Sequence, residues 1–250
     1  MDNVTTTETG GAAWKSLYRV GGVAALLAAL VFRRSLGAEF DVSNGFGVFA
    51  MPETLPVSAP DWFAVLQAYR FVGLTLLGVF DLVEYVLVGL MFLALYGALR
   101  RTNRSALVIA TVFGLIGIAV SLASNQALAL AALSEQYAAA STETQRALLL
   151  AGGEALLAIN QRGIGLYVSL FLVLLSGLII SIVMLRSAVF SKATAIAGIL
   201  ANGLGLAYFV TLAFAPAIIW LPPTLSAPFR LIWYVLIALK LFQLARREEK

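Results

Sequence analysis

The chain contains no cysteine and no histidine, and only 12% of its 250 residues are charged. The two missing residue types exclude disulfide bonds, thiolate or imidazole metal ligands, and catalysis by Ser-His-Asp or Cys-His groups. Soluble domains carry about 25% charged residues, whereas this chain is 61% hydrophobic and has a mean hydropathy of +0.93. The composition therefore predicts a multi-pass membrane protein. It also predicts that the protein binds no cofactor and no metal. Without histidine and cysteine the sequence offers no recognisable catalytic group, which argues against an enzyme.

Six apolar runs in the chain have the character of membrane-spanning helices, which need roughly 20 residues each. They predict an all-α fold: a six-span transmembrane bundle forming one domain over residues 17–244, with short tails at 1–16 and 245–250. The expected spans are about 17–32, 71–98, 106–133, 163–185, 193–219 and 229–244.

Basic residues lie near the two ends of the chain, at Lys15 and Arg19 and in the tail 245–250, and in the loops 100–104 and 186–192. Positive charge marks the cytoplasmic loops of membrane proteins, so we expect both termini in the cytoplasm and the protein in the cell (inner or plasma) membrane. The same bias accounts for the basic pI, which leaves no patch to bind nucleic acid. The expected partners are the lipid bilayer and either a second copy of the chain or other membrane proteins.

Two segments on the outer face are expected to lie outside the six spans. Residues 35–69 form a long loop rich in aromatic residues, and Ser58 with Asp61 has the spacing of a capping box, so a short interfacial helix is expected to begin near Ala59. Residues 144–160 are apolar but too short to cross the bilayer. They predict an interfacial or re-entrant half-helix.

Two carboxylates, Asp81 and Glu84, lie well inside the apolar run 71–98. An ionised carboxylate at the centre of a spanning helix costs about 2.5 to 3.5 kcal/mol, so something must compensate for the pair. A spacing of three places both on one helix face, which is suited to a proton or cation site. The alternative is a structural role, in which they hold helices together. Asn202 and Tyr85 are the first candidates for their partners.

A second set of polar residues is expected toward the outer face, either as a substrate vestibule or as an ordinary solvated rim. Its members come from several segments of the chain, and a charge pair between Glu154 and Arg162 is one expected contact. The set comprises Asn125, Gln126, Glu154, Asn160, Gln161, Arg162 and Arg230.

The stretch LALYGALRRTNRSAL at the end of the second span, together with the closing turn and tail after the sixth span, resembles a known family. The family comprises bacterial six-helix inner-membrane proteins known only as a domain of unknown function. The resemblance covers most of residues 18–244. It implies a six-helix membrane fold and brings no activity and no catalytic residues.

Two functional hypotheses of different classes follow from the sequence. In the first, the chain is an accessory or scaffold subunit, because Gly21, Ala25 and Ala29 form a stripe of small residues that lets another helix approach closely. In the second, it is a small transporter or channel that uses Asp81 and Glu84 as a proton or cation site.

The charge bias makes a testable prediction about topology. A reporter fused after Arg104 should report a cytoplasmic position in a bacterial host, and the same reporter fused after Glu143 should report an external one. Paired fluorescent-protein and alkaline-phosphatase fusions measure both positions. An external signal after Arg104 would reverse the predicted orientation.

Overall fold

The computed structural model describes residues 5–40 and 56–247, and helices are the only regular structure in those residues. Six stretches are long and apolar enough to cross a membrane, which confirms the all-α, six-span fold. The helices are α1 (Thr5–Phe40), α2 (Ala59–Ala68), α3 (Arg70–Leu76), α4 (Val79–Leu99), α5 (Arg104–Ser124), α6 (Ala127–Ala139), α7 (Glu143–Arg162), α8 (Ile164–Leu185), α9 (Lys192–Phe214), the 3₁₀ turn η1 (Pro216–Ile218) and α10 (Leu221–Arg247).

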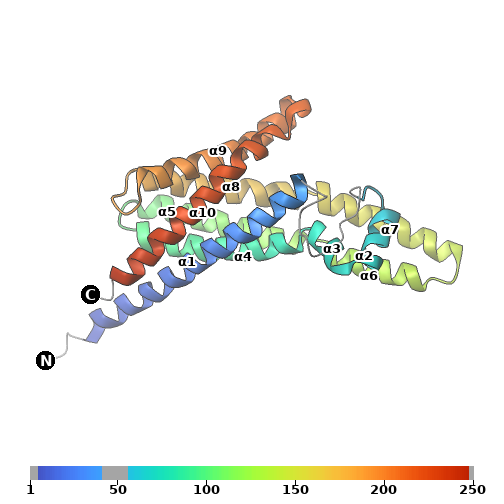
Figure 1. Cartoon of the computed structure of the whole chain (residues 1–250), viewed down its shortest axis with the longest axis horizontal. Helices are drawn as coiled ribbons and strands as arrows, with labels where there is room; N and C mark the ends of the chain where they lie inside the picture. The colour runs from blue at the N-terminus through green and yellow to red at the C-terminus, as the bar shows by residue number, and fades with distance from the viewer. Residues whose placement is uncertain (1–4, 41–55, 248–250) are drawn as a thin grey trace.

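Six long helices run side by side and form the bundle, while four helices gather at one end of it (Figure 1). The bundle consists of α1, α4, α5, α8, α9 and α10. We call α2, α3, α6 and α7 the cap. The start of α1 and the end of α10 lie together at the opposite end of the bundle (Figure 1). This arrangement agrees with an even number of spans, and the side on which the termini lie stays a prediction.

The stripe of small residues on α1 faces the interior of the same chain. Ala25 has no exposed surface and Ala29 is 7% exposed. Gly21 lies so close to α4 that a side-chain methyl group there would overlap the Cβ of Ala94. Close approach of α1 and α4 therefore depends on these small side chains, which pack within one core with residues of α8, α9 and α10.

Three of the long apolar segments are interrupted near one level of the molecule. The expected span 71–98 is divided into α3 and α4 because Gly78 adopts a left-handed backbone conformation, with φ 84°. Similar interruptions separate α5 from α6 at Asn125 and α7 from α8 at Gly163. Asp81 consequently lies in the first turn of α4, and the interruption falls at Gly78, one of the two glycines, with Gly73, at which the length of the segment predicts a bend.

The hairpin of α6 and α7 extends the bundle at its capped end (Figure 1). The segment Arg104–Ala139 has 36 residues, or about 54 Å of helix, against a hydrocarbon thickness of about 30 Å. The cap has a small core of its own, which includes Trp62, Phe63, Leu130 and Leu157. The expected half-helix 144–160 is therefore most of α7 and packs against α6, and its position relative to the membrane surface stays a prediction.

Other segments also differ in extent from the sequence-based boundaries. Helix α1 continues beyond the expected span 17–32 at both ends. Residues 41–55 of the expected outer loop lie outside the described residues. The short helix expected near Ala59 is α2, and Ser58 donates a hydrogen bond from its Oγ to the Asp61 carboxylate at 2.5 Å. This bond and a second one from the Ser58 backbone lower the pKa of Asp61.

The close packing of α1 can be tested with a matched pair of glycine substitutions. Gly21→Ala should lower the free energy of unfolding by about 1–3 kcal/mol because the added methyl group overpacks the contact with α4. Gly203→Ala adds the same group where nothing lies within 4 Å, and it should leave stability unchanged or raised. Melting temperatures in detergent measure both, and equal melting temperatures for the two variants would contradict the packing described.

Candidate functional site

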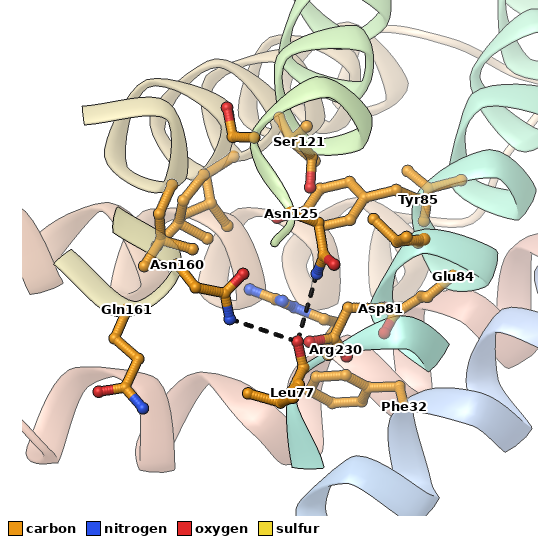
Figure 2. Close-up of a pocket in the computed structure, with 18 of the residues that line it drawn as sticks. Phe32, Leu77, Asp81, Glu84, Tyr85, Ser121, Asn125, Asn160, Gln161 and Arg230 are labelled. Atoms are coloured by element: carbon orange, nitrogen blue, oxygen red, sulfur yellow. Dashed lines mark hydrogen bonds between the residues drawn. The ribbon is translucent and has the colours of Figure 1, made fainter. Parts of the chain in front are cut away.

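A cavity of about 550 Å³ lies where the interrupted helices meet. Its lining combines residues from α1, α3, α4, α5, α7, α8, α9 and α10, and several of their side chains converge on the same space (Figure 2). One part of the lining is apolar and includes Val88, Phe92, Leu170 and Leu174. The polar part includes Asp81, Glu84, Tyr85, Ser121, Ser124, Asn125, Asn160, Gln161, Asn202, Arg230 and Tyr234.

The two carboxylates have different surroundings. Glu84 is half-buried and accepts a hydrogen bond from the Tyr234 hydroxyl at 3.1 Å. Asp81 is exposed and lies in the first turn of α4, where the helix dipole favours a negative charge. A Cβ atom on Gly78 would lie 3.0 Å from the Asp81 Oδ2 atom, so the glycine leaves space for this carboxylate beside the helix interruption.

Two asparagines connect the three interruptions across the cavity (Figure 2). The amide nitrogens of Asn125 and Asn160 both donate to the Leu77 carbonyl, at 3.2 Å and 3.5 Å. The Asn160 Oδ1 atom accepts from the backbone nitrogen of Gln126 at 2.7 Å, and the Asn125 Oδ1 atom accepts from that of Ala127 at 3.0 Å. These bonds satisfy backbone groups that the helix interruptions leave without helical partners.

Arg230 brings a positive charge to the same cavity from α10. Its side chain is half-buried, and its Cζ atom lies 5.1 Å from the centre of the Phe32 ring. Within the described residues, Arg230 forms no ion pair within 4.0 Å. Most of its hydrogen-bond donors therefore stay available to a ligand or to water in the cavity.

Asn202 lies deep in the bundle, with 4% of its surface exposed. Its amide nitrogen donates to the Gly198 carbonyl at 2.7 Å. The absence of a side chain at Gly177 makes room for it, because a Cβ atom there would overlap the Asn202 amide. Asp81, Glu84, Tyr85 and Asn202, which were grouped from the sequence, thus line one cavity, and their function stays a prediction.

The residues expected to form a separate outer vestibule are divided between two places. Asn125 and Arg230 line the cavity with the carboxylates. Gln126 contributes a backbone group to the asparagine contacts. Glu154 lies in the cap, where it accepts a hydrogen bond from the Ala59 backbone nitrogen at 2.7 Å, and Arg162 is exposed at the end of α7. Within the described part of the chain, Glu154 and Arg162 form no ion pair.

Tyr234 lines the cavity as well, although no sequence motif marked it as a site residue. Its position, four residues after Arg230, places both side chains on one face of α10. That spacing was the available signal, but it gave no indication of a contact with Glu84, which lies 150 residues earlier in the chain.

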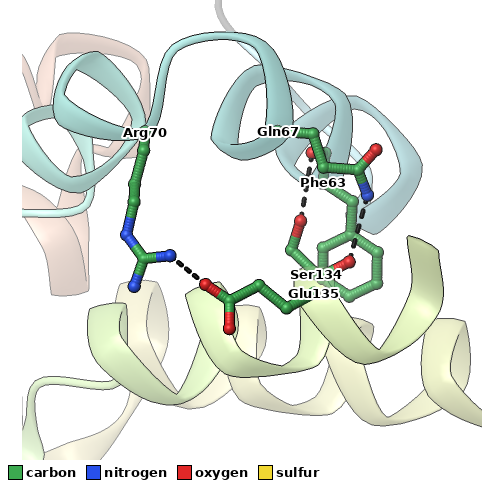
Figure 3. A network of polar contacts seen from close by, with 5 residues as sticks. All are labelled: Phe63, Gln67, Arg70, Ser134 and Glu135. Atoms are coloured by element: carbon green, nitrogen blue, oxygen red, sulfur yellow. Dashed lines mark hydrogen bonds and ion pairs between the residues drawn. The ribbon is translucent and has the colours of Figure 1, made fainter. Parts of the chain in front are cut away.

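Polar contacts join the helices of the cap to one another (Figure 3). The Ser134 hydroxyl donates to the Phe63 carbonyl at 3.2 Å, and the Gln67 side chain donates to the Ser134 carbonyl at 3.0 Å. Arg70 and Glu135 form an ion pair between α3 and α6. Leu77 and Asn160, which border the cavity, therefore belong to segments that pack together in the cap.

The helical bundle with its apolar surface defines an integral, multi-pass membrane protein. The chain belongs to the family described as Domain of unknown function (DUF4386), which matches residues 41–244. This match confirms the family resemblance noted in the sequence. No match was found among curated proteins or among solved structures. Within the described residues, no group of three or more acidic side chains is arranged to hold a metal ion.

The asparagine contacts make a testable prediction about stability. Asn160→Ala should lower the free energy of unfolding by about 1–3 kcal/mol because it leaves the Gln126 backbone nitrogen without its partner. The adjacent Gln161→Ala is the control, since the Gln161 side chain points away from these bonds (Figure 2). Thermal unfolding in detergent measures both variants, and an unchanged melting temperature for Asn160→Ala would refute the structural importance of these bonds.

Proposed function

We propose that the protein is a small membrane transporter or channel, and that its cavity binds a proton or cation through Glu84 and Asp81. The observation that carries this proposal is that both carboxylates face one cavity of about 550 Å³ at the interruption of three long helices. Ionisable residues within membrane segments commonly mark ion or substrate pathways. The distribution of basic loops supports a position in the cell membrane with both termini in the cytoplasm.

The contacts of Glu84 support binding over a purely structural function. A carboxylate that only holds helices together is best paired directly with a cation or with several donors. Within the part of the chain that the structure describes, Glu84 has one hydrogen bond, from Tyr234, and it faces a cavity that also contains several amide and hydroxyl groups. A polar cavity of this size accommodates water, through which a proton or small cation can reach the carboxylate.

The interrupted helices support the same proposal. Non-helical backbone at membrane depth is tolerated where it is buried in protein or lines a polar cavity, and transporters use such interruptions to build binding sites. Here the interruptions at Gly78 and Asn125 both border the cavity.

The scaffold hypothesis loses one of its two supports. It was motivated by the lack of a catalytic group and by the small residues Gly21, Ala25 and Ala29, a stripe that lets another helix approach closely. Those residues pack against helices of the same chain, so the stripe is unavailable to a partner.

Flux measurements in liposomes test the proposed function. The double variant Asp81→Asn, Glu84→Gln should reduce proton or monovalent-cation flux by at least about tenfold, because the amides keep the shape of the site and remove its charge. Glu143→Gln is the control, since the Glu143 side chain is 91% exposed in the cap. Flux that survives unchanged in the double variant would refute the proposal.

Thiol labelling establishes independently whether water reaches the carboxylates, since the wild-type chain has no cysteine. Cysteines placed at positions 81 and 84 should react with a small, charged, membrane-impermeant reagent. A cysteine replacing Ala110, which has no exposed surface, is the control and should stay unlabelled. Absence of labelling at 81 and 84 in the folded protein would contradict an aqueous path.

A further inference from the structure

The cavity is lined by a negatively charged and a positively charged side chain that form no direct ion pair within the described residues. Glu84 reaches it from α4 and Arg230 reaches it from α10. No ion pair joins these two side chains within 4.0 Å in the described part of the chain. The cavity therefore presents a negatively charged carboxylate, which accepts hydrogen bonds, and a positively charged guanidinium, which donates them.

Within the described residues, each of these two charged groups has one close contact with another side chain. The Arg230 guanidinium has the face of the Phe32 ring at 5.1 Å, and Glu84 has the Tyr234 hydroxyl at 3.1 Å. A charge removed from bulk water needs a counter-charge or several hydrogen bonds to offset its desolvation. A singly charged ligand would compensate one of them and leave the other as before.

The uncharged part of the lining indicates the size and polarity of the ligand that the cavity fits. Beyond the charged residues, Val88, Phe92, Leu170 and Leu174 give the cavity an apolar wall. Its volume of about 550 Å³ lies in the range of about 300–1,000 Å³ that is typical of small-molecule sites. A hydrated inorganic ion would make no use of this apolar wall.

We propose that the cavity binds a small zwitterion with an apolar body, of the class of hydrophobic α-amino acids. Glu84 binds the ammonium group, Arg230 binds the carboxylate, and the apolar wall contacts the side chain. The proposal rests on the proposed function and deepens it, because the cation at Glu84 is then the ammonium group of the substrate. Arg230 suits this position because its planar fork matches a carboxylate.

A comparison of three related ligands on the full chain in lipid nanodiscs tests the charge requirement without any mutation. L-phenylalanine carries both charges, 2-phenylethylamine carries only the positive charge, and 3-phenylpropionate carries only the negative charge. L-phenylalanine, measured with a radiolabel, should bind at least about tenfold more tightly than either analogue, measured by competition. Equal or weaker binding of L-phenylalanine would overturn the proposal.

Charge-removing variants assign the two ends of the ligand. Arg230→Gln should weaken L-phenylalanine binding at least about tenfold and leave 2-phenylethylamine unchanged. Glu84→Gln should weaken L-phenylalanine equally and leave 3-phenylpropionate unchanged. Arg146→Gln and Glu143→Gln are the matched controls, because they form an exposed pair in the cap. If Arg230→Gln does not fold, Arg230→Lys keeps the charge without the fork and should give an intermediate affinity.

The outcomes separate this inference from the proposed function. Flux of protons or inorganic cations that depends on Glu84, together with no binding of L-phenylalanine, would overturn the zwitterion and leave the proposed function standing. Unchanged L-phenylalanine binding in both Arg230→Gln and Glu84→Gln would also overturn the assignment, because the ligand would then lie elsewhere.

Discussion

A backbone group inside a membrane protein needs a hydrogen-bond partner from the protein itself or from water in a cavity, and this constraint governs the arrangement of the whole chain. Interrupting three long helices near one level leaves several such groups without helical partners. Asn125 and Asn160 supply those partners by bonding the Leu77 carbonyl and the backbone nitrogens of Gln126 and Ala127. The interruptions at Gly78 and Asn125 are therefore stabilised by side chains of neighbouring segments, and Asn160 of α7 bonds to both.

The cavity follows from this arrangement. An unbroken helix through residues 71–98 would place Asp81 in mid-helix, whereas the break at Gly78 puts its carboxylate at a helix start beside open space. Glu84 is one turn deeper and meets the hydroxyl of Tyr234. Arg230 then brings the opposite charge from the last helix. The polar site is thus built from residues at the helix interruptions and residues on the uninterrupted helix α10.

Much of the fold is readable from the sequence, because length and hydropathy define spanning helices without knowledge of their neighbours. The grouping of Asp81, Glu84, Tyr85 and Asn202 was also accessible, since a polar side chain in an apolar run has few favourable places to go. The contacts of Asn125, Asn160 and Glu154 were not, because they join segments far apart in the chain and carry no periodic signal. The helix that packs against the small-residue stripe could not be predicted for the same reason. A stripe of small residues has the same sequence pattern whether the helix that it contacts belongs to the same chain or to another.

The position of the helix interruptions gives the molecule a natural pivot. Rotation about a few backbone torsions near Gly78, Asn125 and Gly163 would tilt the cap as a rigid lever, with an arm of about 20 Å for the 13 residues of α6. A tilt of about 10° would displace its tip by about 3 Å while the bundle stayed fixed.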